Sequence, residues 1–119
     1  MALAQTAPEG ALEALEDGLT DARGVADPSE ISAVARHAAA ICDHLGHLSR
    51  ALGYYEEAIV GEPDNGYLHF ATGDVLRRLH APGARGRFTR SLELALEQGD
   101  RELADLASAA IAAGEHQDS

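Results

Sequence analysis

The stretch A-L-G-Y-Y-E-E-A-I-V-G-E-P-D-N, residues 51–65, decides how this chain folds. Ala51, Tyr55 and Ala58 stand at i, i+4 and i+7, so a small, a large and a small side chain share one helical face. A C-terminal stop follows at Gly61, and Pro63 cannot continue a helix. This pattern predicts a helix that packs against a neighbour on each side and then ends sharply.

The composition indicates a single helical domain over residues 1–119 with a core of small side chains. A chain of 119 residues is long enough for one core but not for two. Aromatic residues make up 4% and tryptophan is absent, so the helices must approach one another over small side chains. The net charge of −11 argues against sequence-independent binding to nucleic acid and favours a neutral or basic partner.

The number of cysteines and the hydropathy of the sequence indicate in which cellular compartment the protein is expected. Cys42 is the only cysteine, which leaves no internal disulfide and no Cys-rich metal site. Residues 1–8 lack the basic and apolar regions of a secretory signal, and no apolar run approaches the roughly 20 residues of a membrane span. We therefore expect a cytoplasmic protein that does not bind membranes.

The hydrophobic periodicity predicts six helices, and no stretch shows the alternation typical of strands. Glycine, proline and capping residues mark the helix ends. We expect a loose lead-in over residues 1–8 and a frayed tail over residues 114–119. The predicted helices cover residues 9–24, 28–45, 49–60, 65–79, 84–98 and 100–113.

Several residues recur at a nearly constant interval. Small residues stand 34 apart at Ala39, Gly73 and Ala107. The pattern of residues 51–58 recurs at residues 84–91, and a deletion in the turn at residues 81–83 accounts for the slightly shorter interval. The recurring set is Ala51-x3-Tyr55-x2-Ala58 and Ala84-x3-Phe88-x2-Ser91.

These motifs resemble the tetratricopeptide repeat, in which a small residue of the first helix of each pair lies close to the second helix. Repeats would cover residues 32–65 and 66–99, about two thirds of the chain, with residues 100–113 as a capping helix. The resemblance implies an all-α fold of antiparallel helix hairpins, stacked as a short right-handed superhelix of about six helices. Ala35 and His69 depart from the family, which has a large residue there. The alternative is an ordinary helical bundle whose small residues recur by chance; against it, Tyr55, Phe88, Gly73 and Pro63 are not alanine and still match.

The resemblance also implies a function. In the family, the first helices line a concave groove that binds peptides or protein segments, so we expect a non-enzymatic protein–protein interaction module. Tyr67, Phe70 and Arg77 lie on one helical stripe, and aromatic residues with arginine are typical of binding hot spots. Aromatic stripes more often belong to a core, but Asp74 and Arg77 are hard to bury. The groove residues that the resemblance implies are Arg36, Ala40, Asp43, His44, Tyr67, Phe70, Asp74, Arg77 and Arg78.

An alternative function rests on three histidines. His37, His44 and His47 suggest a metal-binding helical bundle or a metal-dependent enzyme, although Gly46 interrupts the helix between the last two. No Gly-rich phosphate loop, serine elbow or spaced carboxylate pair is present in the sequence. We therefore expect no enzymatic activity and no cofactor.

Charge and repeat number bear on the partners. Residues 1–30 carry seven acids and one arginine, whereas residues 77–90 carry five arginines and no acid. These segments could meet between subunits, the basic one could bind an acidic partner, or both could be solvated surface. Two repeats are normally too few for a stable array, so we expect a homodimer that covers the apolar face of the last helix. That face consists of Leu103, Leu106, Ala107, Ala110 and Ile111.

Overall fold

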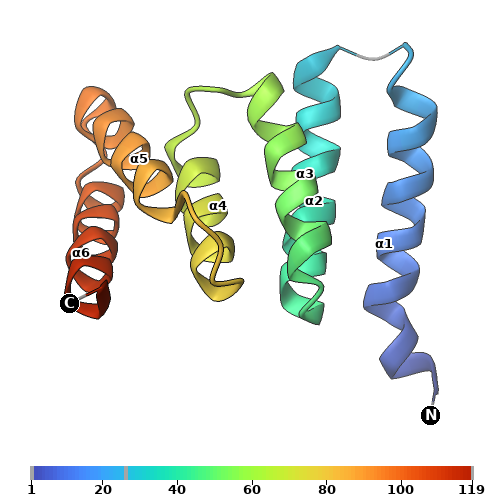
Figure 1. Ribbon diagram of the computed structural model, residues 1–119. Helices are drawn as coiled ribbons and strands as arrows, with labels where there is room; N and C mark the ends of the chain where they lie inside the picture. Colours follow the sequence, from blue (N-terminus) through green and yellow to red (C-terminus); the bar gives the residue numbers. More distant parts are fainter. Residues whose placement is uncertain (1, 26, 119) are drawn as a thin grey trace. The chain divides into compact units, whose positions relative to one another are not determined.

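The computed structural model describes residues 2–25 and 27–118, with side chains for residues 8–25 and 27–114. This part of the chain contains six helices and no strand (Figure 1). Helices that are consecutive in sequence make nearly all the contacts between helices. The prediction of an all-α chain with six helices is confirmed. The helices are α1 (Ala2–Ala22), α2 (Pro28–Leu45), α3 (Leu48–Gly61), α4 (Gly66–Arg78), α5 (Ala84–Gln98) and α6 (Arg101–Asp118).

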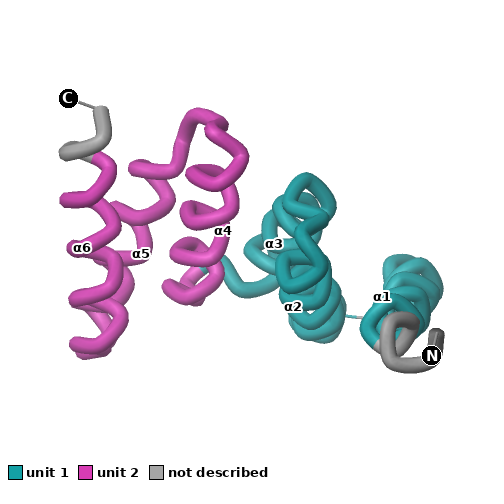
Figure 2. The backbone as a smooth tube through the Cα atoms, turned by 90° about the horizontal axis from the view of Figure 1, so that it is seen from below, with its two compact units in different colours: residues 1–63 teal, residues 64–119 magenta. Residues whose placement is uncertain are grey.

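The chain divides into two compact units (Figure 2). Unit 1, residues 1–63, holds α1, α2 and α3, and unit 2, residues 64–119, holds α4, α5 and α6. The division falls close to the repeat boundary that the sequence predicts between Asn65 and Gly66. None of the described helices is long and apolar enough to cross a membrane.

The two terminal helices are longer than predicted. α1 already begins at Ala2, so residues 2–8 are helical rather than a loose lead-in. α6 runs on to Asp118, so residues 114–118 are helical rather than a tail, because Gly114 only weakens a helix and does not stop it. Met1 and Ser119 lie outside the described residues.

Two helices begin at a residue whose side chain caps the helix. The side chain of Asn65 accepts hydrogen bonds from the backbone N–H groups of Tyr67 at 3.1 Å and Leu68 at 3.4 Å. Asp100 accepts one from the N–H of Leu103 at 3.0 Å. These bonds satisfy N–H groups that have no partner inside the helix, and they fix where α4 and α6 begin.

In unit 1 the hairpin of α2 and α3 closes over small side chains. A Cβ atom on Gly61 would stand 2.3 Å from the carbonyl oxygen of Pro28 and 2.8 Å from Cβ of Ser32. Gly61 is therefore glycine because the two backbones touch there, and not only because the helix ends. Ser32 is fully buried, with its hydroxyl 2.6 Å from both the carbonyl oxygen of Ala58 and a carboxylate oxygen of Glu62.

In unit 2 the core is built around Phe88. Gly73 lies under its ring, since a Cβ there would stand 2.9 Å from two ring carbons. The ring of Phe70 tilts against that of Phe88, with 5.3 Å between centroids. The buried hydroxyl of Ser91 donates to the carbonyl oxygen of Gly66 over 2.9 Å. This packing holds α4 against α5.

Candidate functional site

The predicted groove residues of unit 1 lie on the solvent side of α2. Arg36, Ala40 and His44 are exposed at successive helical turns, and Asp43 is half-buried beside them. The guanidinium of Arg36 lies 3.8 Å from a carboxylate oxygen of Glu62. These residues lie on a solvent-accessible face of α2.

The predicted binding residues of unit 2 form two sets, one accessible to solvent and one packed inside the unit. Tyr67 is 50% exposed, and Asp74 and Arg78 form a partly exposed ion pair at 3.1 Å. Partial desolvation and a hydrogen bond to the Asp100 carboxylate raise the pKa of Tyr67. These three side chains are accessible to a partner.

The other two residues of the stripe pack inside unit 2. Phe70 packs against the buried cluster of Ala95, Leu103 and Ala104. The guanidinium of Arg77 lies over the ring of Phe88, 4.9 Å from its centroid, and donates to the carbonyl oxygen of Ala110 over 3.1 Å. Periodicity alone does not distinguish a stripe that faces a groove from one that partly faces the next helix.

A pocket of about 400 Å³ opens in unit 2, at the turn between α4 and α5 and beside α6. The described residues that line it include no aspartate or glutamate. α5 begins at its rim, after Gly83, and its first turn has no side-chain cap. Its lining includes Arg77, His80, Arg85, Phe88, Ala110 and Ile111. The run of arginines at residues 77–90 was the sequence signal for it.

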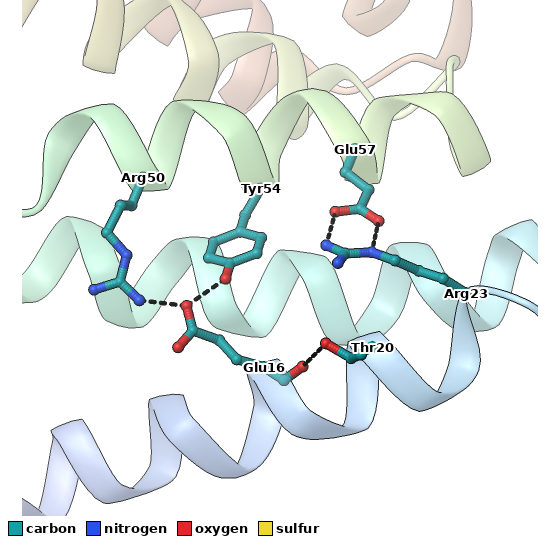
Figure 3. Close-up of polar contacts among 6 residues, drawn as sticks. All are labelled: Glu16, Thr20, Arg23, Arg50, Tyr54 and Glu57. Atoms are coloured by element: carbon teal, nitrogen blue, oxygen red, sulfur yellow. Dashed lines mark hydrogen bonds and ion pairs between the residues drawn. The ribbon is translucent and has the colours of Figure 1, made fainter.

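A second polar cluster holds α1 to α3 in unit 1 (Figure 3). Arg23 makes two parallel hydrogen bonds of 2.8 Å to the carboxylate of Glu57. Glu16 accepts from both Arg50 and Tyr54. The Tyr54 hydroxyl and then Arg50 lower the pKa of Glu16, whereas burial and the Glu16 charge raise that of Tyr54.

Sequence reasoning missed this cluster because its partners are far apart in the chain and lie on different helices. A shallow pocket of about 290 Å³ lies beside it, lined by Arg23, Arg50, Tyr54 and Glu57. Each of these four side chains is already bonded to another residue of unit 1. The cluster therefore joins helices rather than offering open ligand groups.

The three histidines of the alternative hypothesis are not arranged as the ligands of a metal ion. His37, His44 and His47 are all exposed on unit 1. Across the described residues, no group of three or more His, Cys, Asp or Glu side chains is placed to hold a metal ion. Cys42 is buried, and burial raises the pKa of its thiol, which disfavours the thiolate that a nucleophile needs.

Comparisons with protein-family models, with curated proteins and with solved structures give no significant match for this chain.

Proposed function

We propose that this chain is a non-enzymatic protein–protein interaction module of the tetratricopeptide type, which binds a peptide or protein segment. The observation that carries the proposal is a hydrogen bond within each hairpin. In both hairpins this bond joins the first helix to the second at equivalent positions of the repeat. Ser32 and Ala58 of unit 1 correspond to Gly66 and Ser91 of unit 2 when the two recurring patterns are aligned. In both hairpins a buried serine hydroxyl meets the carbonyl oxygen of its equivalent partner, with the two roles exchanged.

The backbone hydrogen bonds at the C-terminal ends of α2 and α4, the first helices of the two hairpins, are also alike. Gly46 N–H donates to the carbonyl of Asp43, and the next N–H donates to that of Cys42. At the equivalent end of α4, His80 N–H donates to the carbonyl of Arg77, and the next N–H donates to that of Leu76. Because the same pair of bonds also closes α5, at Gly99 and Asp100, the two serine bonds are the stronger support for two copies of one structural unit, which would stack as a short right-handed superhelix.

The exposed faces of the first helices supply the binding surface in this proposal. α2 presents Arg36 and His44, and α4 presents Tyr67, Asp74 and Arg78. Exposed tyrosine and arginine are enriched at binding hot spots, because each combines a large contact area with hydrogen-bond donors. The cytoplasm is the compartment that we propose for this activity.

Self-association is the second part of the proposal. Leu103, Ala107 and Ala110 of α6 are buried within unit 2, so the apolar face left for a second copy is smaller than the sequence suggested. Leu106 remains 46% exposed and Ile111 is half-buried. We therefore expect the fraction of homodimer to rise with protein concentration between the micromolar and the millimolar range. Light scattering, which gives the mean molar mass, measures this fraction directly.

The binding test starts from a random peptide display selection on the whole chain. Selected peptides are then measured by fluorescence anisotropy against a Tyr67→Ala/Arg78→Ala variant. Phe70 and Arg77 are left unchanged, because their loss would damage the core of unit 2. We expect the variant to bind at least about tenfold more weakly, with unchanged helicity by circular dichroism.

The matched control is Arg90→Ala/Leu96→Ala, which removes an arginine and a large exposed side chain from α5, a second-type helix. This control should bind like the original chain. If the groove variant and the control bind equally well, the first helices are not the binding surface. If selection yields no peptide that binds, the proposed function itself fails.

A further inference from the structure

We infer that α1 is an exchangeable helix, which docks either on the α2–α3 hairpin of its own chain or, through the same contacts, on that of a second copy. This inference goes beyond the homodimer proposed above, which would form through α6, and it does not depend on whether the two hairpins are repeats. Three observations support it: α1 buries few side chains, partly exposed polar side chains join it to α3, and a pocket lies between the two helices.

α1 packs mainly on α2 and buries only a small part of its own surface. Among its described side chains, those of residues 8–22, only Leu12 and Leu19 are buried. A segment that buries few apolar side chains opens at a lower free energy than the core of the same protein. We therefore expect α1 to leave α2 and α3 while these two helices remain packed against each other.

Two polar ties join the α1 end of unit 1 to α3, and both use partly exposed side chains (Figure 3). The carboxylate of Glu16 accepts hydrogen bonds from Arg50 and Tyr54. Arg23, directly after α1, pairs with Glu57 through two bonds of 2.8 Å. Both arginine side chains are about half-exposed, so water replaces these bonds at little cost. The ties therefore fix where α1 docks without preventing its release.

The space between α1 and α3 is not filled by side chains. A shallow pocket of about 290 Å³ lies there, among the four residues that make the two ties. Gly53 of α3 also lines this pocket, and a Cβ atom on it would meet nothing within 4 Å. At this pocket no close packing is lost when α1 separates from α3.

A second copy of the chain is the partner that fits the face uncovered on α2 and α3. The α1 helix of another copy restores the two buried leucines and both polar ties. Because the same bonds form in both arrangements, the exchange costs only the opening of the connection after α1 and the freedom that two chains lose on association. High protein concentration therefore favours the exchanged dimer.

Reversing the charges of the Glu16–Arg50 pair tests this exchange in the whole chain. Neither Glu16→Arg nor Arg50→Glu can form the pair within one chain, because both positions then carry the same charge. When the two variants are mixed and refolded together from urea, exchange of α1 places opposite charges together at both docking sites of a heterodimer. We expect this heterodimer to associate at least about tenfold more tightly than either variant with itself. Native mass spectrometry identifies it, because the two variants differ in mass.

Two controls separate exchange from other effects of charge. The double variant Glu16→Arg/Arg50→Glu carries the reversed pair within one chain and should regain the Tm of the original chain without a partner. Asp74→Arg and Arg78→Asp change the charge in the same way at a pair within α4, which exchange of α1 cannot restore, so their mixture should give no such heterodimer. If the variants at residues 16 and 50 do not fold, Arg23→Glu and Glu57→Arg provide the same test at the second tie.

Hydrogen exchange of the original chain tests the release of α1 itself. The backbone amides of residues 12–22 should exchange at least about tenfold faster than those in the middle of α2 and α3. Their exchange should become faster still in about 1 M salt, which screens the two ion pairs. Equal protection of the three helices would overturn the release of α1.

The mixing experiment has two outcomes that overturn the inference. One is the absence of a heterodimer with both sets of variants; the other is an equal amount of heterodimer with the control pair of α4. A dimer that forms through α6 would appear equally in all variants and would restore no Tm on mixing, so it is distinguished from exchange. None of these results touches the groove variant of the proposed function, so the two ideas fail separately.

Discussion

Replacing Gly61 with alanine tests whether the hairpin of unit 1 is held by backbone contact. The added Cβ would stand 2.3 Å from the carbonyl oxygen and 2.8 Å from the carbonyl carbon of Pro28. The oxygen is about 1 Å closer than van der Waals contact allows. A backbone carbonyl cannot turn aside as a side chain can, so α2 and α3 would have to separate.

The expected loss follows from three terms. Overpacking that moves backbone costs about 1–3 kcal/mol. Separation of the helices also weakens the buried hydrogen bond from Ser32 to the Ala58 carbonyl, at about 1 kcal/mol. Alanine returns less than about 1 kcal/mol through its better helix propensity. Gly61→Ala should therefore lower the free energy of unfolding of unit 1 by about 1–3 kcal/mol.

Gly53→Ala is the matched control in the same helix. Nothing lies within 4 Å of a Cβ at Gly53, so only the propensity gain remains, and the control should stabilise unit 1 by about 0.5–1 kcal/mol. Urea unfolding followed by tyrosine fluorescence reports mainly on unit 1, where Tyr54 and Tyr55 lie. Equal stability of the two alanine variants would show that the close approach of α2 and α3 contributes nothing.

Two further predictions concern polar groups. Ser91→Ala removes a buried hydroxyl that donates to the Gly66 carbonyl, and Ser32→Ala removes one that lies 2.6 Å from both the Ala58 carbonyl and the Glu62 carboxylate, so each should cost its own unit about 1–2 kcal/mol in urea unfolding; a variant without cost would mean that these acceptors find another donor. The pKa of Glu16 is lowered in the folded chain, so its pairing with Arg50 and Tyr54 stabilises α1 above pH 4.5, its ordinary value, and is lost as pH falls through the folded value. Glu16→Gln should thus be less stable than the original chain by up to about 1 kcal/mol at pH 7, and the difference should shrink as the pH falls below 4.5; a difference that does not change with pH would contradict the pairing.

The helices were largely predictable because their end signals are local. The bounds of α2 and α5 match the prediction, since Gly46 and Gly99 adopt the left-handed conformation that glycine at a helix end predicts. Gly114 was misinterpreted for a related reason: the same residue type also occurs inside helices, and α6 continues through it. Gly61 has a role that no local rule contains, because its meaning comes from Pro28 at the start of the preceding helix.

The candidate sites were less predictable because they depend on which helix faces which. The arginines of residues 77–90 drew attention to the basic segment, but only the structure brings Arg77 and Arg85 into one pocket with Phe88. Phe70 lies on the same predicted helical stripe as Tyr67, and yet Phe70 packs against the core of unit 2. Helical period places a residue on a face; the neighbour of that face is set by tertiary packing.

Cys42 gives this chain a built-in reporter. It is the only thiol, it is fully buried, and its burial disfavours the reactive thiolate. An alkylating reagent can therefore modify it only after unit 1 opens, so the rate of mass increase measures the opening equilibrium when reclosing is fast. Because unit 2 carries no cysteine, that rate reports on unit 1 by itself, under native conditions and without denaturant.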